Sequence, residues 1–149
     1  MQKQLFRLGS YGLFLLLLAI TFFPQTADGQ VDSLGEPIFS GVKIYAIPFT
    51  SRTRRPLSEQ DVIQHYDILI SVRDEYLPDD ILSYVDSLET RPPIKYENVR
   101  IVCEVYREES LDAKVNVHFG GIISMKGTYY QPFAKLLDLI FYYLPEEYK

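Results

Sequence analysis

The stretch 98–119 of the chain, NVRIVCEVYREESLDAKVNVHF, contains two clear strands. Its first half, Asn98–Arg107, and its second half, Leu111–Phe119, place hydrophobic residues at every second position, which is typical of half-buried strands. The acidic link Glu108–Ser110 is short, so we expect the two strands to form an antiparallel hairpin. We therefore expect this hairpin to be the main part of an antiparallel sheet.

The spacing of the hairpin predicts which residues share a face. A three-residue turn pairs Glu104 with Lys114 and Cys103 with Val115. The residues expected on the core face of the first strand are Val99, Ile101, Cys103 and Val105. His118 then lies on the opposite face, and only a bulge would bring it to Cys103. Because a free cysteine behaves as a small hydrophobic residue, we expect Cys103 to be a buried core residue.

Other segments predict three more strands and two helices before the C-terminal region. The expected strands are Val42–Phe49, Asp67–Arg73 and Ile122–Met125, which are rich in β-branched residues or alternate in hydrophobicity. Ser58, followed by Asp61, predicts the start of a short helix over Glu59–His65. Pro78 suits the first turn of a second helix.

The C-terminal region gives the clearest helical pattern in the chain. Pro132 opens this helix, and its hydrophobic residues follow helical spacing. They are Phe133, Leu136, Leu137, Ile140, Phe141 and Leu144. Leu139 and Tyr143 widen the apolar arc, so we regard these two residues as a candidate interface for a partner protein or a second copy of the chain. The alternative is that the helix is central and fully covered.

The predicted elements follow the order β-α-β-α-β-β-β-α, without an internal repeat. Such an order is typical of the α+β class, and we expect a single small domain with one mostly antiparallel sheet. The helices are expected to pack on one face of that sheet, giving a two-layer sandwich. The order of the strands within the sheet does not follow from the pattern.

Composition excludes several classes of protein. The chain has 149 residues, one cysteine and a formal net charge of −5. One cysteine cannot form an internal disulfide framework, a zinc finger or an iron–sulfur site. The two histidines lack metal-ligand spacing, so we expect no metal site and no cofactor. The acidic balance argues against nucleic acid as a partner, because nucleic-acid binding requires a basic surface.

The N-terminal segment resembles an export signal. Basic residues precede a hydrophobic run, Tyr11–Phe23, which is shorter than the ~20 residues that a membrane-spanning helix needs. Small residues at positions 27 and 29 predict cleavage before Gln30, and a retained signal anchor is the alternative. We therefore expect a signal peptide at 1–29, a flexible tether at 30–40 and the α+β domain at 41–149. The membrane is a partner only during export, to the periplasm or the extracellular space.

The outer face of the hairpin is a mixed polar surface that could bind a ligand. Its residues are Arg100, Val102, Glu104, Tyr106, Lys114, Asn116 and His118. An enzyme could use His118 as a base, with Glu104, Tyr106 or Arg100 assisting. An ordinary solvated face with a Glu104–Lys114 pair is the competing interpretation.

The turn at Gly120–Gly121 bears on that choice. A two-residue turn would put Ile123 and Met125 on the same face as His118. Either that face is partly covered, or the turn has a different length.

The densest basic cluster is the loop with Arg52, Arg54 and Arg55. Arginine side chains match phosphates, carboxylates and acidic protein surfaces, so this loop is a candidate anion or acidic-partner site. A solvated loop is the alternative.

These observations favour an exported, non-catalytic domain that binds another envelope protein or self-associates. The alternative is a small envelope enzyme or ligand-binding domain with its site on the outer sheet face around His118. No motif in the sequence fixes a chemistry, so we lean toward the non-catalytic function.

Overall fold

The computed structural model describes residues 39–148, and the expected signal peptide at 1–29 lies outside this range. Most of the expected tether, 30–38, also lies outside it. The two tether residues that are described contact the hairpin, since Phe39 O accepts from Glu109 N at 2.9 Å and Ser40 Oγ accepts from Glu108 N at 3.0 Å.

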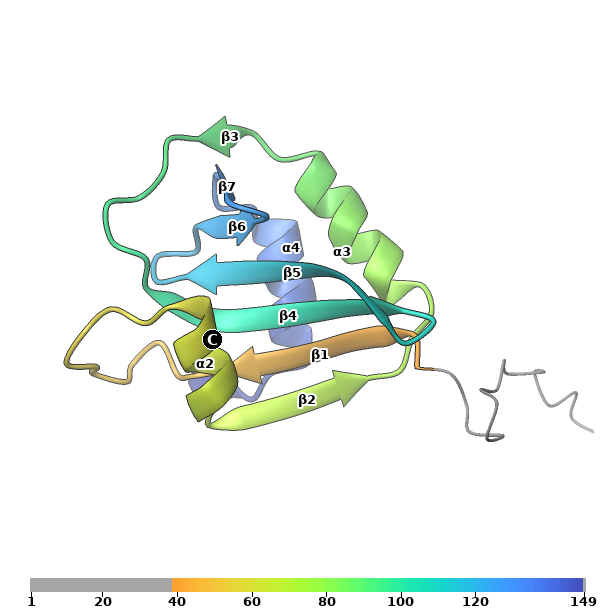
Figure 1. Cartoon of the computed structure of the whole chain (residues 1–149), viewed down its shortest axis with the longest axis horizontal. Coiled ribbons are helices and arrows are strands. Elements are labelled where there is room, and N and C mark those ends of the chain that lie inside the picture. The colour runs from red at the N-terminus through yellow and green to blue at the C-terminus, as the bar shows by residue number, and fades with distance from the viewer. Residues whose placement is uncertain (1–38, 149) are drawn as a thin grey trace, which may run out of the picture. The chain divides into compact units, whose positions relative to one another are not determined.

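One antiparallel sheet of seven strands forms the centre of the described region (Figure 1). The strands are β1 (Gly41–Ala46), β2 (Ile68–Val72), β3 (Thr90–Arg91), β4 (Val99–Arg107), β5 (Ser110–His118), β6 (Ile123–Met125) and β7 (Thr128–Tyr130). Their spatial order is β2-β1-β4-β5-β6-β7-β3, so β2 and β3 are the edges of the sheet. The α+β class and the antiparallel sheet are thus confirmed. The short strands β3 and β7 were not predicted.

The central register of the β4–β5 hairpin agrees with the prediction. Glu104 lies opposite Lys114, and Cys103 lies opposite Val115. The turn itself is tighter than expected, because Ser110 already pairs with Arg107. A register shift between Val105 and Tyr106 compensates for the shorter turn.

A second register shift places one predicted core residue on the other face. It falls between Val99 and Ile101, so that Arg100 is an extra residue in β4. Val99 therefore packs with Val102 on the outer side of the sheet, whereas Ile101 faces the main core. The expectation that Val99 shares a face with Ile101 was wrong, because a bulge reverses the alternation of side chains.

His118 pairs with Ile122 at the end of β5, so the turn that these two residues close has three residues, 119–121. His118 N donates to Ile122 O at 2.8 Å, and Val117 lies opposite Ile123. Ile123 is therefore buried in the main core and Met125 packs against it. The question left open by the sequence is answered by the length of the turn, which is not of the two-residue kind.

The main core lies between the sheet and two helices, α3 (Leu77–Asp86) and α4 (Ala134–Tyr142). Its central residues include Ile44, Ile81, Ile101, Cys103, Val115, Leu136 and Ile140. The short helix η1 (Glu146–Tyr148) follows α4, and its Tyr148 packs against the same core.

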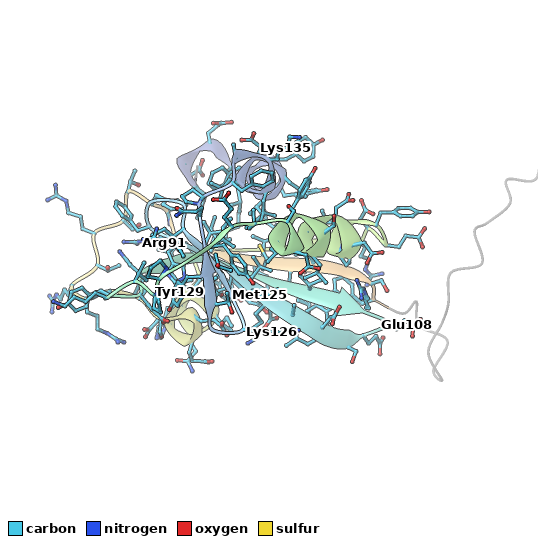
Figure 2. The ribbon with its side chains drawn as sticks, turned by 90° about the horizontal axis from the view of Figure 1, so that it is seen from above. Arg91, Glu108, Met125, Lys126, Tyr129 and Lys135 are labelled. Atoms are coloured by element: carbon cyan, nitrogen blue, oxygen red, sulfur yellow. The ribbon has the colours of Figure 1, made fainter. Side chains whose placement is uncertain are left out.

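The third helix, α2 (Glu59–His65), packs on the opposite face of the sheet. Figure 2 shows α4, which carries Lys135, and α2 on opposite sides of the strands. The predicted capping box starts α2, since Ser58 Oγ accepts from Asp61 N at 3.2 Å. Val62 of this helix is fully buried against Val99 and Val102. The expectation that all helices share one face is therefore wrong for α2, and the sheet has a helix on both sides.

Candidate functional site

Glu104 is the centre of a hydrogen-bonded network on the outer face of the sheet. Its carboxylate accepts from Tyr45 Oη at 3.1 Å and from Tyr106 Oη at 2.9 Å. Lys114 Nζ lies 3.4 Å from its other oxygen. Burial, together with the negative charge of Glu104, raises the pKa of Tyr45 to about 12 and also raises the pKa of Tyr106. Both phenols therefore stay protonated and donate to Glu104, which joins β1, β4 and β5.

His118 belongs to a different group of residues. It is 1% exposed, and its Nε2 lies 2.8 Å from Ser124 Oγ, while Nδ1 has no hydrogen-bond partner. Burial lowers the pKa of His118, and the charge of Glu97 opposes this shift only in part. The imidazole is therefore neutral at pH 7 and shielded from solvent.

The residues proposed as catalytic do not meet in one place. Glu104 and Tyr106 are in contact, but His118 and Glu104 share no partner. Lys114, which pairs with Glu104, lies four residues from His118 along β5, or about 13 Å. Arg100 is directed elsewhere, toward the loop after β1. The structure thus separates the four side chains into three environments.

A groove of about 360 Å³ runs beside the His118 group. It is lined by Glu59, Glu97, Leu111, Asp112, Ala113, Lys114, Asn116, Ser124, Lys126, Gly127 and Tyr129. Tyr129 donates a hydrogen bond to Glu97, which is the main reason why the pKa of Tyr129 rises to about 12. Asn116 Nδ2 donates to Glu59 Oε2 at 2.9 Å, while Asn116 Oδ1 is buried without a partner.

Sequence reasoning missed most of this groove. Glu59 comes from α2, and Tyr129 comes from the unpredicted strand β7, which Figure 2 shows beside the turn at Lys126. The strand β7 is only three residues long, too short for alternation to be visible. The position of α2 over the outer face had no signal in the sequence.

The arginine loop forms a second cavity, of about 580 Å³, which we call the arginine pocket. Its lining consists of Phe49, Thr50, Ser51, Arg52, Thr53, Arg54, Arg55, Pro56, Asn98, Arg100 and Phe119. Arg55 Nη2 bonds Asp61 Oδ1 at 2.6 Å. The structure thus brings Arg100, which was predicted on the outer sheet face, into one pocket with the candidate anion loop.

The remaining candidates have simpler surroundings. Cys103 is fully buried, and burial raises the pKa of its thiol to about 12, so it is not a nucleophile. Leu139 and Tyr143 are half-buried and pack against the main core. In residues 39–148 no group of three or more potential ligands is arranged to hold a metal ion. Nor does this part of the chain contain a helix long and apolar enough to cross a membrane.

Comparison with known proteins gives no match to a family model, to a curated protein or to a solved structure.

Proposed function

We propose that this chain is an exported, non-catalytic domain that works as a homodimer, joined edge to edge through β2. The single observation that carries this proposal is the edge of the sheet at Ile68–Val72, which no other strand of residues 39–148 covers (Figure 1). Export to the periplasm or the extracellular space rests on the segment 1–29. The engagement of Glu104 in structural bonds supports binding over catalysis.

The two edges of the sheet differ in how well they are protected. The edge strand β3 has only two residues, and Pro92 and Pro93 follow it. The edge strand β2 has five residues, ILISV, without proline, charge or bulge. Among the described residues, the backbone of Ile68–Val72 hydrogen-bonds only to β1. Proteins usually block such an edge, so an unblocked one favours pairing with another strand.

The sequence around β2 is complementary to itself, which favours a second copy over a different protein. An antiparallel pair of β2 strands centred on Ile70 places Asp67 of each copy opposite Arg73 of the other. Both residues are exposed and flank the hydrophobic strand. The pairing therefore forms two cross-strand ion pairs around a hydrophobic centre.

The candidate interface residue Tyr143 lies close enough to Asp74 for the charge of Asp74 to act on its hydroxyl group. The charge of Asp74, which follows β2 closely, contributes after burial to the raised pKa of Tyr143. Tyr148 is likewise influenced by the charge of Asp67. Tyr143 and Tyr148, which follow α4 and pack against the main core, would extend the interface on the core side.

Charge reversal tests the proposal by sedimentation of the protein purified after expression of the full chain. Asp67→Arg and Arg73→Asp each convert two attractive pairs into two repulsive ones, so each single variant is expected to be monomeric. The double variant restores both pairs and is expected to dimerise again. Asp86→Arg and Lys135→Asp, which make the same charge changes on α3 and α4, are the matched controls and keep the dimer.

Other outcomes contradict the proposal. A wild-type protein that is monomeric at every concentration excludes the homodimer, and capture of another envelope protein through the same edge would replace it. Dimerisation that survives both single reversals, or that both controls disrupt, would show that the contact lies elsewhere.

The alternative function, a small envelope enzyme or ligand-binding domain with its site around His118, is favoured by one observation. Asn116 lines the groove beside Ser124, and its buried Oδ1 has no hydrogen-bond partner among the described residues. Saturation-transfer NMR with a fragment library tests this alternative, with Asn116→Ala as the loss variant. Fragments that bind wild type but not the variant would support it, and a screen without such fragments would contradict it.

A further inference from the structure

We propose that the arginine pocket binds the phosphate group of an organic phosphate, which is either a soluble phosphate ester or a lipid headgroup. The proposal rests on four observations. They are a pocket lined by arginines without an acidic residue, a buried arginine without a partner, a loop that is hydrogen-bonded at both ends, and exposed aromatic rings beside the arginines. It is independent of the proposed dimer.

The charge of the pocket is opposite to that of the chain. Four arginines line the pocket without any acidic residue, although the chain has 20 Asp and Glu against 15 Lys and Arg. Only Arg55 has an acidic partner, Asp61. Among the described residues, Arg52, Arg54 and Arg100 form no ion pair. Three uncompensated cations at one pocket favour an anion that carries more than one charge.

Arg100 is the strongest indication that the pocket binds an anion. The residue is 4% exposed, and its Nε and Nη1 are buried without a hydrogen-bond partner. Its guanidinium instead lies over the ring of Phe119, 5.8 Å from the centroid. A buried charge without a partner is destabilising, so its presence is explained when a ligand supplies the opposite charge.

The bulge in β4 accounts for the direction of Arg100. Arg100 is the extra residue between Val99 and Ile101, both of which are buried. Bulges turn a side chain out of the regular alternation and are frequent beside binding sites. Here the bulge takes Arg100 away from the Glu104 network and into the arginine pocket.

The loop over the pocket is fixed at both ends to the strand that carries Arg100. Ile47 N donates to Arg100 O at 2.9 Å, and Val99 N donates to Leu57 O at 2.8 Å. Leu57 N also donates to Asn98 Oδ1 at 3.4 Å. Figure 1 shows this loop between β1 and α2 at the same end of the sheet as the β5–β6 turn. The arginines are thus held near one another before any ligand arrives, which lowers the entropic cost of binding.

A phosphate fits this pocket better than a carboxylate does. The arginines come from a loop and from a strand, and a tetrahedral phosphate offers oxygens in several directions, whereas a carboxylate is planar and carries one charge. Hydroxyl groups of Thr50, Ser51 and Thr53 in the lining are further donors.

The wall and the size of the pocket indicate that the phosphate has an organic part. Phe119 is 56% exposed, and its ring lies 6.4 Å from that of Phe49. Exposed aromatic rings beside an anion site accommodate an apolar group of the ligand. The cavity of about 580 Å³ is also larger than a bare phosphate ion requires.

Calorimetric titration with phenyl phosphate tests the site directly. We expect phenyl phosphate to bind, and benzoate to bind at least ~10-fold more weakly, because it has one charge and a planar anion. The double variant Arg52→Gln/Arg54→Gln, with both changes on exposed loop residues, is expected to bind phenyl phosphate about 100-fold more weakly. Lys135→Gln on α4 is the matched control and binds as wild type does.

Arg100→Met separates a ligand-binding role from a structural one. If Arg100 serves to bind an anion, its charge is unpaired in phosphate-free buffer, and the substitution raises the melting temperature of the protein there. The substitution then also abolishes the increase in melting temperature that phenyl phosphate causes in wild type. If Arg100 stabilises the fold by itself, the same substitution lowers the melting temperature, which would contradict our account of the pocket.

Vesicle sedimentation distinguishes the two sources of phosphate. Binding to phosphatidylcholine vesicles that contain phosphatidic acid, but not to phosphatidylcholine alone, assigns the site to a lipid headgroup. Binding of phenyl phosphate without vesicle binding assigns it to a soluble ester. The proposal is overturned if neither binds, if benzoate binds as tightly as phenyl phosphate, or if the double arginine variant binds like wild type.

Discussion

Substitution of Glu104 distinguishes a structural carboxylate from a catalytic one. The residue is 7% exposed, and its carboxylate accepts hydrogen bonds from Tyr45 and Tyr106, at 3.1 and 2.9 Å. Hydrogen bonds to a charged group contribute about 1.5–3 kcal/mol each. The Lys114 pair contributes about 0.2–1 kcal/mol, because the lysine is partly exposed and Glu59 lies 3.3 Å from its ammonium group.

The lower ends of these ranges add to about 3 kcal/mol, so we expect Glu104→Ala to lower the free energy of unfolding by at least that much, and Glu104→Gln by about 1–2 kcal/mol. The glutamine keeps an acceptor for one phenol but loses the charge. Urea unfolding followed by circular dichroism gives both values, with the exposed Glu109→Gln as the control, expected within about 0.5 kcal/mol of wild type. Tyr45→Phe combined with Glu104→Gln completes a double-mutant cycle.

If Glu104→Gln costs no more than Glu109→Gln, the Tyr45 and Tyr106 bonds do not stabilise the sheet. Glu104 would then be a strained, functional carboxylate, and the non-catalytic interpretation of the outer face would lose its main support.

Three further predictions follow from the burial of single residues and from the N-terminus. Because the pKa of His118 is lowered in the folded state, the unfolded chain takes up the proton first as the pH falls. The contribution of His118 to the free energy of unfolding is therefore fully present above the ordinary pKa of 6.5 and is lost as the pH drops below it. Unfolding at pH 7 and pH 5 checks this prediction: His118→Gln should flatten the dependence, whereas the same change at the exposed His65 should leave it intact. Cys103, with a pKa of about 12 and no exposure, should resist iodoacetamide at pH 8 and react in urea; labelling of the folded protein at the unfolded rate would contradict its burial. Intact-mass measurement of the exported protein should place the N-terminus at Gln30, whereas the full mass of 17.3 kDa would indicate a retained anchor.

The main elements of the fold follow from local patterns in the sequence. The alternation in β4 and β5 predicts their central pairing, and Ser58 with Asp61 predicts α2 with its observed bounds. These features depend on residues that are close in the sequence, so they can be predicted from the sequence alone.

The candidate sites depend on features that local patterns do not contain. The bulge at Arg100 adds one residue to β4 and thereby reverses the face of Val99, which precedes it. The side of the sheet on which α2 packs through Val62 depends on tertiary contacts, because the short hydrophobic face of this helix could pack against either side. The arginine loop was visible in the sequence, but its meeting with Arg100 required both the bulge and the anchored loop.

Amide hydrogen exchange at the β2 edge is the most direct test of the proposed homodimer. In a dimer paired through Ile68–Val72, peptides that cover this strand exchange more slowly at high protein concentration than at low concentration, while peptides that cover β3 exchange equally at both. The single variant Asp67→Arg should remove the concentration dependence. Exchange in β2 that is independent of concentration, in a protein that nonetheless sediments as a dimer, would contradict the proposed pairing.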